Sequence, residues 1–241
     1  MKLLKSITVL VFLLSTTLSS AQWGNGKKIK GNGDITTVKR TTTDYEGLKA
    51  AGPMDFILVE GKEGNITIKG DANVIEYIVT EVVNNTLIVK VKNGINLKPT
   101  QAIVITVPYE RINRVSLAGS GDIENRGTLE SNDFNVALTG SGDIKLNVSA
   151  QNIESSIAGS GDITLKGTTN DLTTKIAGSG DFNGSNLSSK NVTAKITGSG
   201  DISVICNGEL TVRITGSGDV EYSGKPTKKD TKITGSGSVS N

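Results

Sequence analysis

Six aspartates recur at a nearly constant interval in the second half of the chain. They are Asp122, Asp143, Asp162, Asp181, Asp201 and Asp219, and each one closes a Gly-Ser-Gly-Asp tetrapeptide. These tetrapeptides start 18 to 21 residues apart, and a seventh copy at Gly235 reads Gly-Ser-Gly-Ser. Carboxylate and carbonyl oxygens are the ligands that Ca²⁺ takes in proteins. If the copies lie side by side, their carboxylates form an aspartate ladder, which is the first place to look for metal chemistry.

Such a ladder also raises a problem of charge repulsion. Ionised carboxylates on strands ~4.8 Å apart repel one another. Amides of each aspartate's own bend, together with solvent screening, can offset that repulsion. Calcium held between units is the alternative, but calcium sites normally supply more acidic ligands per ion. We therefore predict no catalytic, cofactor-binding or metal-binding residues, with a calcium ladder as the competing hypothesis.

The segments that flank each tetrapeptide predict β-strands. Apolar and polar residues alternate there with period two, as in Leu172 to Ile176 and Leu210 to Ile214. Glycine suits the sharp bend between two such strands. A repeat that holds over more than a hundred positions, without a crossover helix, predicts a coil that stacks on itself. The expected fold is all-β, a single-stranded right-handed parallel β-helix with about 19–20 residues per rung.

Two other repeat folds fit the sequence less well. Leucine-rich repeats have a similar period, but segments such as Leu165 to Leu172 lack their leucine and asparagine pattern. Calcium-binding nonapeptide repeats also combine glycine, aspartate and an apolar residue. The second half of each unit here has no glycine-rich copy of its own, since Leu165 to Lys175 contains a single glycine.

The chain is expected to divide into a regular and an irregular part. Residues 117–238 carry the tetrapeptide repeats, and 35–116 are expected to form wider, irregular rungs of the same 35–241 domain, with a separate N-terminal domain as the alternative. Weaker copies of the bend start at Gly31 and Gly52. Asn84-Asn85 predicts a tight turn, and Ala72 to Val79 a short helical segment. Residues 22–34 are expected to be a flexible segment.

The N-terminus predicts export. A basic start, an apolar stretch from Ile7 to Leu14 and the small residues Ser19 to Ala21 form a signal peptide over 1–21, cleaved before Gln22. We expect an exported protein in the periplasm, at the cell surface or outside the cell, with no membrane insertion after cleavage. Without Lys2 and Lys5 the mature chain has 24 basic and 24 acidic residues, so nucleic acid is not an expected partner.

Composition excludes several kinds of catalytic site. The chain has no histidine, so a Ser-His-Asp triad, a Cys-His pair and histidine-based zinc ligation are all absent. Its one cysteine, Cys206, lies in an apolar run and is expected to be buried. A row of serines, Ser120 through Ser236, could contact a glycan or could simply be satisfied hydroxyls. Three of the four tyrosines lie before residue 117, so if the chain has a binding groove, the irregular part is the first place to look for it.

The sequence resembles a known family. The repeated Ile-x-Gly-Ser-Gly-Asp-Ile pattern, the run from Tyr45 to Gly61 and the strand Ala102 to Pro108 leading into Leu117 to Asp122 are similar to the autotransporter adhesin head, or GIN, domain, long a domain of unknown function. The resemblance covers about residues 35 to 238. It implies a right-handed β-helix from an exported protein of a Bacteroidetes-type bacterium, and it brings no catalytic residues.

Three function classes remain. The first is a non-enzymatic cell-envelope or surface module that binds a glycan or an envelope protein, and we favour it. The second is a carbohydrate-active enzyme, a polysaccharide lyase or hydrolase, which would need a positioned acid and base where this chain spreads its acids evenly. The third is a purely structural envelope protein. The ligand, the binding face and the oligomeric state do not follow from the sequence.

Overall fold

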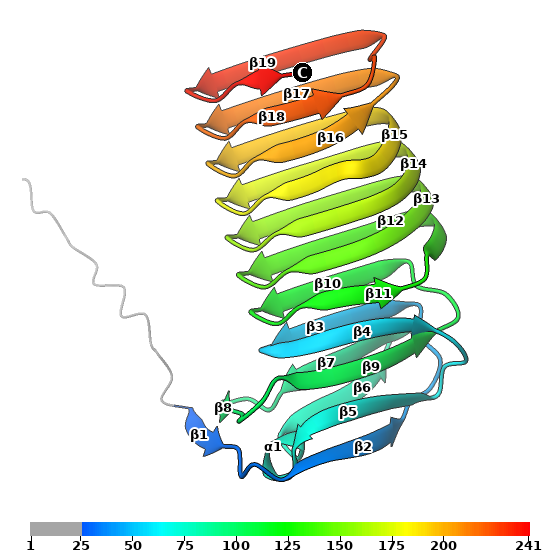
Figure 1. Cartoon of the computed structure of the whole chain (residues 1–241), viewed down its shortest axis with the longest axis vertical. Helices are drawn as coiled ribbons and strands as arrows, with labels where there is room; N and C mark the ends of the chain where they lie inside the picture. Colours follow the sequence, from blue (N-terminus) through cyan, green and yellow to red (C-terminus); the bar gives the residue numbers. More distant parts are fainter. Residues whose placement is uncertain (1–25) are drawn as a thin grey trace, which may run out of the picture.

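The chain forms a parallel β-solenoid. The structure is a computed structural model that describes residues 26–241, so the predicted signal peptide lies outside the described residues. The backbone coils about seven times, and its regular secondary structure is almost entirely β-strand, which confirms the predicted parallel β-helix. Figure 1 shows the coils stacked along one long axis, with the C-terminal strands β19 and β20 at one end and β2 and α1 at the other.

Each regular coil consists of two strand segments joined by two corners. One corner is the Gly-Ser-Gly-Asp bend, called here the GSGD corner. At the other, called the second corner, β13, β14 and β15 continue without a break, as at Gln151-Asn152. The strands of the regular coils are β10 (Arg114–Gly119), β11 (Ile123–Arg126), β12 (Leu129–Gly140), β13 (Ile144–Gly159), β14 (Ile163–Gly178), β15 (Phe182–Gly198), β16 (Ile202–Cys206), β17 (Glu209–Gly216), β18 (Val220–Ser223), β19 (Lys228–Gly235) and β20 (Val239–Ser240).

The register of the stack places equivalent residues of successive repeats side by side. The segment before the GSGD corner pairs in parallel from β3 (Gly47–Gly52) up to β19, and the segment after it from β4 (Met54–Glu60) up to β20. Alternate residues point inward, so one buried row runs along the stack through Ile157, Ile176 and Ile196. This continuous row of aliphatic side chains is the core.

Glycine at the GSGD corner is required by the close approach of neighbouring coils. Gly180, the second glycine of its tetrapeptide, is buried. A Cβ at this position would overlap the carbonyl oxygen of Gly161 in the preceding coil. The amides of Ser179 and Gly180 both donate to the carbonyl oxygen of Gly159, at 2.9 and 3.1 Å. The glycines of this corner therefore stack through direct contact of their backbones.

Small differences in repeat length are absorbed between the corners. The pairing of β14 with β15 shifts register between Thr164 and Lys166, where β15 accommodates an extra residue. The pairing of β15 with β16 shifts again between Gly184 and Ser188. Because both shifts lie between corners, the GSGD bends stay aligned although the repeats differ in length.

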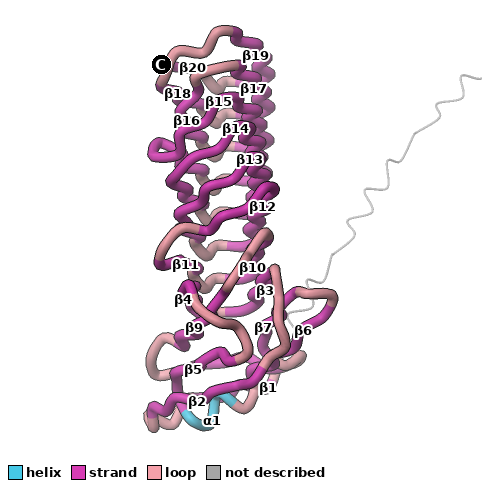
Figure 2. The backbone as a smooth tube through the Cα atoms, turned by 90° about the vertical axis from the view of Figure 1, so that its right-hand side faces the viewer, coloured by secondary structure: helices cyan, strands magenta, loops and turns pink. Residues whose placement is uncertain are grey.

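The N-terminal part covers one end of the solenoid. Its elements are β1 (Lys27–Lys30), β2 (Ile35–Thr41), β3, β4, β5 (Asn65–Asp71), α1 (Ala72–Ile75), β6 (Ile78–Val83), β7 (Thr86–Val91), β8 (Ile95–Lys98) and β9 (Ile103–Tyr109). Strand β2 pairs antiparallel with β5, and β1 pairs with β8 in a separate two-stranded sheet. Figure 2 shows that this end is broader than the regular coils.

Two local predictions in this part are confirmed. Asn84 and Asn85 form the turn between β6 and β7 with φ of 48° and 57°, a conformation that asparagine tolerates well. The predicted helical segment is the short helix α1. The weak bend at Gly52 does stack under Gly119 at the GSGD corner. The copy at Gly31 lies elsewhere, against the Asp71 side chain.

Asp71 holds the covering end together. It is fully buried, and its carboxylate accepts hydrogen bonds from the Gly33 amide (2.7 Å), the Thr100 amide (2.8 Å) and the Thr100 hydroxyl (2.7 Å). These bonds, led by that of the Thr100 hydroxyl, lower the pKa of Asp71. One carboxylate thereby joins three segments that are distant in sequence.

Candidate functional site

The aspartate ladder lies along the GSGD corner as the sequence predicts, but its hydrogen bonds differ from the expected ones. Oδ1 of Asp181 accepts from the backbone amide of Asp201 at 2.8 Å, and Oδ1 of Asp201 accepts from that of Asp219 at 2.7 Å. The donor thus belongs to the next coil and not to the aspartate's own bend. The bend's own amides are already bonded to the preceding coil, so they cannot serve the carboxylate.

The ladder extends beyond the six aspartates at both ends. Oδ1 of Asp55 accepts from the Asp122 amide at 3.1 Å, and burial is the main cause that raises the pKa of Asp55. At the other end Oδ1 of Asp219 accepts both the amide (2.7 Å) and the hydroxyl (2.9 Å) of Ser238. In the last bend, serine stands at the aspartate position, and both its amide and its hydroxyl donate to the aspartate of the preceding coil.

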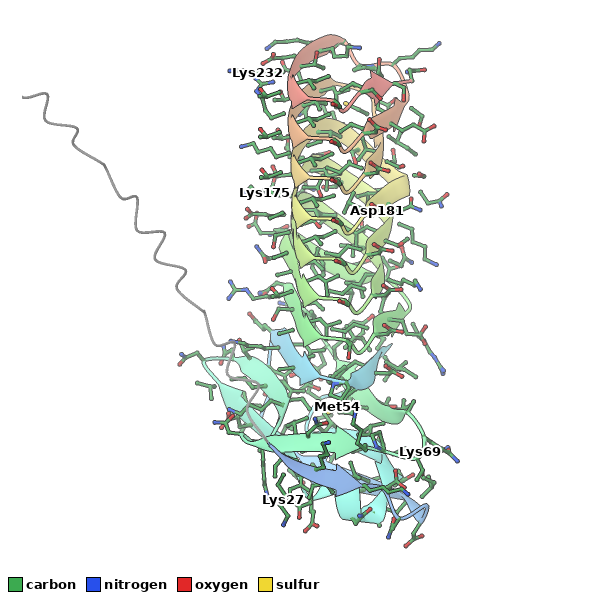
Figure 3. The ribbon with its side chains drawn as sticks, turned by 90° about the vertical axis from the view of Figure 1, so that its left-hand side faces the viewer. Lys27, Met54, Lys69, Lys175, Asp181 and Lys232 are labelled. Atoms are coloured by element: carbon green, nitrogen blue, oxygen red, sulfur yellow. The ribbon has the colours of Figure 1, made fainter. Side chains whose placement is uncertain are left out.

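Calcium binding at the ladder stays a competing hypothesis to be tested. Within residues 26–241, no group of three or more Asp, Glu or Cys side chains is arranged closely enough to hold a metal ion. The serines of the GSGD corner are all exposed to solvent. In the view of Figure 3, Asp181 lies on the side of the rod that faces the reader.

A polar groove runs along the second corner. Its volume is about 1300 Å³, and side chains from successive coils line it. One row of the lining, in register, is Glu130, Ser149, Thr168 and Ser188. Hydroxyl oxygens of Ser149 and Thr168 are 3.2 Å apart. The groove therefore presents hydroxyl groups that can both donate and accept hydrogen bonds.

Amide and carboxylate side chains border the groove in an alternating row. Nδ2 of Asn152 donates to Asp133 at 2.7 Å, and Nδ2 of Asn191 donates to Asp171 at 2.9 Å. Asn170 donates in the same way to Oε1 of Gln151 at 2.5 Å. These bonds link polar side chains of neighbouring coils to one another along the second corner.

The irregular part contributes the lower end of the groove. Tyr109, Glu110 and Arg111 line it there, together with Glu46 and Glu60. The irregular part was the first place to look for a groove, but the continuation of the groove over the regular coils was not expected. Ser, Thr and Asn at this corner share no motif, and only the coil-to-coil register brings them together.

The tyrosines do not form exposed sugar-binding platforms. Tyr45 and Tyr109 are 2% and 3% exposed, and the Tyr45 hydroxyl donates to the Pro108 carbonyl oxygen. Burial is the main cause that raises the pKa of both phenols. Cys206 is buried as expected, and burial raises the pKa of its thiol.

These features define a parallel β-solenoid with a polar groove along one corner. The family model described as "Putative auto-transporter adhesin, head GIN domain" matches residues 44–226, so the chain belongs to this family. No curated protein matches the sequence. Within residues 26–241, no helix has the length and apolar character needed to cross a membrane.

Solved structures share the fold. A "putative adhesin" from Bacteroides fragilis NCTC 9343 is 23% identical with a TM-score of 0.83, over 88% of this chain and 99% of that one. A "putative lipid binding protein" from Parabacteroides distasonis ATCC 8503 is 26% identical with a TM-score of 0.71, over 89% and 99%. A "putative adhesin" from Parabacteroides merdae ATCC 43184 is 21% identical with a TM-score of 0.69, over 89% and 98%. The adhesin description of the family suggests a surface binding module, exported or at the cell surface.

Proposed function

We propose that the protein is an exported, non-enzymatic module that binds a glycan in the groove of the second corner. The observation that carries the proposal is the lining of the groove, which supplies hydroxyl and carboxamide groups over several successive coils. A saccharide offers many hydroxyl groups that need both donors and acceptors. An elongated groove of about 1300 Å³ fits a chain of sugars better than a compact ligand.

Hydrogen bonds between neighbouring coils support the same proposal. Some of the groove's polar side chains are already bonded between coils, such as Asn170 to Gln151. A preorganised surface loses little conformational entropy when it binds. The signal peptide expected over 1–21 would bring the groove into contact with envelope glycans.

Glycan-array binding with matched variants tests the proposal. The mature chain is compared with Thr168→Arg, which places a bulky side chain in the groove, and with Ser160→Arg, which places one at the exposed GSGD corner of the same coil. We expect saturable binding to one glycan class, lost in Thr168→Arg and kept in Ser160→Arg.

The other outcomes are equally informative. Loss only in Ser160→Arg would move the site to the serine row of the GSGD corner. Binding to no glycan would contradict the proposal and favour a protein partner or a structural envelope role. Release of shorter products from a bound polysaccharide would show a carbohydrate-active enzyme instead.

A further inference from the structure

Four basic residues stack directly on one another on the outer face of the sheet that precedes the GSGD corner. Lys175 pairs in register with Lys195, Lys195 with Arg213, and Arg213 with Lys232. We call these four residues the basic row. Lys175 and Lys232 project from the same edge of the rod in Figure 3. Below Lys175, the equivalent position is occupied by Ser156, so the row is confined to four successive coils.

Stacking of like charges on paired strands is unfavourable unless anions lie nearby. Two members of the row have such partners, since Nζ of Lys175 lies 2.6 Å from Glu154 and a guanidinium nitrogen of Arg213 lies 2.5 Å from Asp230. Lys195 and Lys232 have no ion-pair partner within residues 26–241. Both existing pairs are substantially exposed, so each contributes little and can exchange its partner.

The surface around the row is polar. Threonines occupy the neighbouring outward position on three successive coils, at Thr173, Thr193 and Thr211. A shallow hollow of about 670 Å³ adjoins the row, lined by Lys175, Lys195, Thr173 and Thr193 among others. The acids in this hollow already have partners, as Glu154 pairs with Lys175 and Asp171 accepts from Asn191.

We propose that the basic row binds a linear acidic polysaccharide that lies parallel to the solenoid axis. One positive charge per coil at ~4.8 Å makes a regular array about 14 Å long, which complements regularly spaced carboxylates on an extended chain. The adjacent threonine hydroxyls supply hydrogen bonds for sugar hydroxyl groups. This site is separate from the groove of the second corner and does not depend on binding there.

A saccharide fits this surface better than a nucleic acid does. Two acidic residues flank the ends of the row. Glu154 lies below, where it pairs in register with Thr173, and Asp230 lies above, where it pairs with Thr211. A single narrow polyanion can follow the row between them, but a duplex would bring additional phosphates against these carboxylates. The balanced charge of the mature chain also provides no wider basic surface.

The test is binding of polygalacturonate, a linear polyuronate, with neutral dextran as the comparison ligand. The double variant Lys195→Gln/Lys232→Gln removes the two unpaired charges. Its control, Lys69→Gln/Lys166→Gln, removes two exposed lysines that lie outside the row. We expect affinity for polygalacturonate to fall about tenfold in the row variant and to stay unchanged in the control. Affinity should fall with added salt, and oligomers too short to span the row should bind more weakly.

Several results would overturn the proposal. They are the absence of polygalacturonate binding by the unmodified chain, an equal loss in the row variant and its control, and equal affinity for dextran. If duplex DNA binds as tightly as polygalacturonate, the row is a general polyanion site and not a saccharide site. The variant Thr168→Arg separates this site from the groove, because polygalacturonate binding should survive it even if the groove binds no glycan.

Discussion

Replacement of Gly180 by alanine tests whether coil stacking at the GSGD corner depends on the absence of a side chain. A Cβ at Gly180 would overlap the backbone carbonyl oxygen of Gly161 and approach the rest of that residue's backbone. Neither backbone can move without disturbing the coils above and below. Forcing extra atoms into a well-packed site costs roughly 1–3 kcal/mol when side chains can adjust. Because only backbone atoms can move here, we expect Gly180→Ala to lower the free energy of unfolding by the upper value of this range, about 3 kcal/mol.

Thermal and urea unfolding of a short variant set measure this effect. By the usual scaling for a chain of this size, about 3 kcal/mol lowers the Tm by about 6 to 12 °C. Ser179→Ala changes an exposed side chain in the same bend and should change stability by no more than about 0.5 kcal/mol. Gly33→Ala is a second control, because Gly33 has φ of 80° but open space around its Cβ position. Conformational strain alone should cost it about 1–2 kcal/mol.

The order of these three variants decides the argument. We expect Gly180→Ala to be the least stable, Gly33→Ala intermediate and Ser179→Ala close to the unmodified chain. If Gly180→Ala is as stable as Ser179→Ala, the coils can separate at the corner without cost. In that case, close approach of the backbones of neighbouring coils would not explain why glycine recurs at this position.

Further predictions concern the carboxylates, calcium and the thiol. The lowered pKa of Asp71 means that its contribution to stability is complete above the unfolded value of about 3.9 and is lost as pH falls through the folded pKa. Asp71→Asn should therefore be less stable at pH 7, with a gap that narrows in urea unfolding below about pH 4; a constant gap would contradict this reasoning. Asp181→Asn keeps an oxygen that can accept the Asp201 amide and should stay near the unmodified stability, whereas Asp181→Ala should lose about 1 kcal/mol in the same assay. EDTA and calcium should leave the Tm unchanged, and a rise with calcium would restore the calcium ladder. Cys206 should resist iodoacetamide in the folded chain and react fully in urea, as judged by mass spectrometry.

The parts of the fold that the sequence predicts are those encoded by repetition or by local backbone chemistry. The spacing of the tetrapeptides predicts the coil, because every copy bends at the same place and only stacking buries its apolar residues. The Asn84-Asn85 turn follows from the tolerance of asparagine for positive φ. The covering end was less predictable, because Asp71 receives its hydrogen bonds from Gly33 and Thr100, which no motif connects to it.

The candidate binding surfaces escaped prediction for two different reasons. The groove depends on a corner with no sequence signature, so its hydroxyl groups become neighbours only through register. The basic row did have a signal, since Lys175, Lys195, Arg213 and Lys232 are spaced by 20, 18 and 19 residues, as the tetrapeptides beside them are. Applying the repeat period to charged residues, and not only to glycine and aspartate, would have found it.

The two corners of the solenoid differ in how strongly the fold constrains their side chains. At the GSGD corner, the glycines are fixed by backbone contact, and five of the six aspartates accept a hydrogen bond from an amide of the next coil, so the glycines and aspartates there have little freedom to change. The second corner and the outer sheet face meet no such constraint, because alternate inward residues already complete the core. Side chains on these surfaces can vary from coil to coil without altering the stack. Ligand specificity should therefore depend on residues outside the Gly-Ser-Gly-Asp tetrapeptides, where the side chain varies from coil to coil. Substitution of the repeated glycines and aspartates should change stability far more than binding.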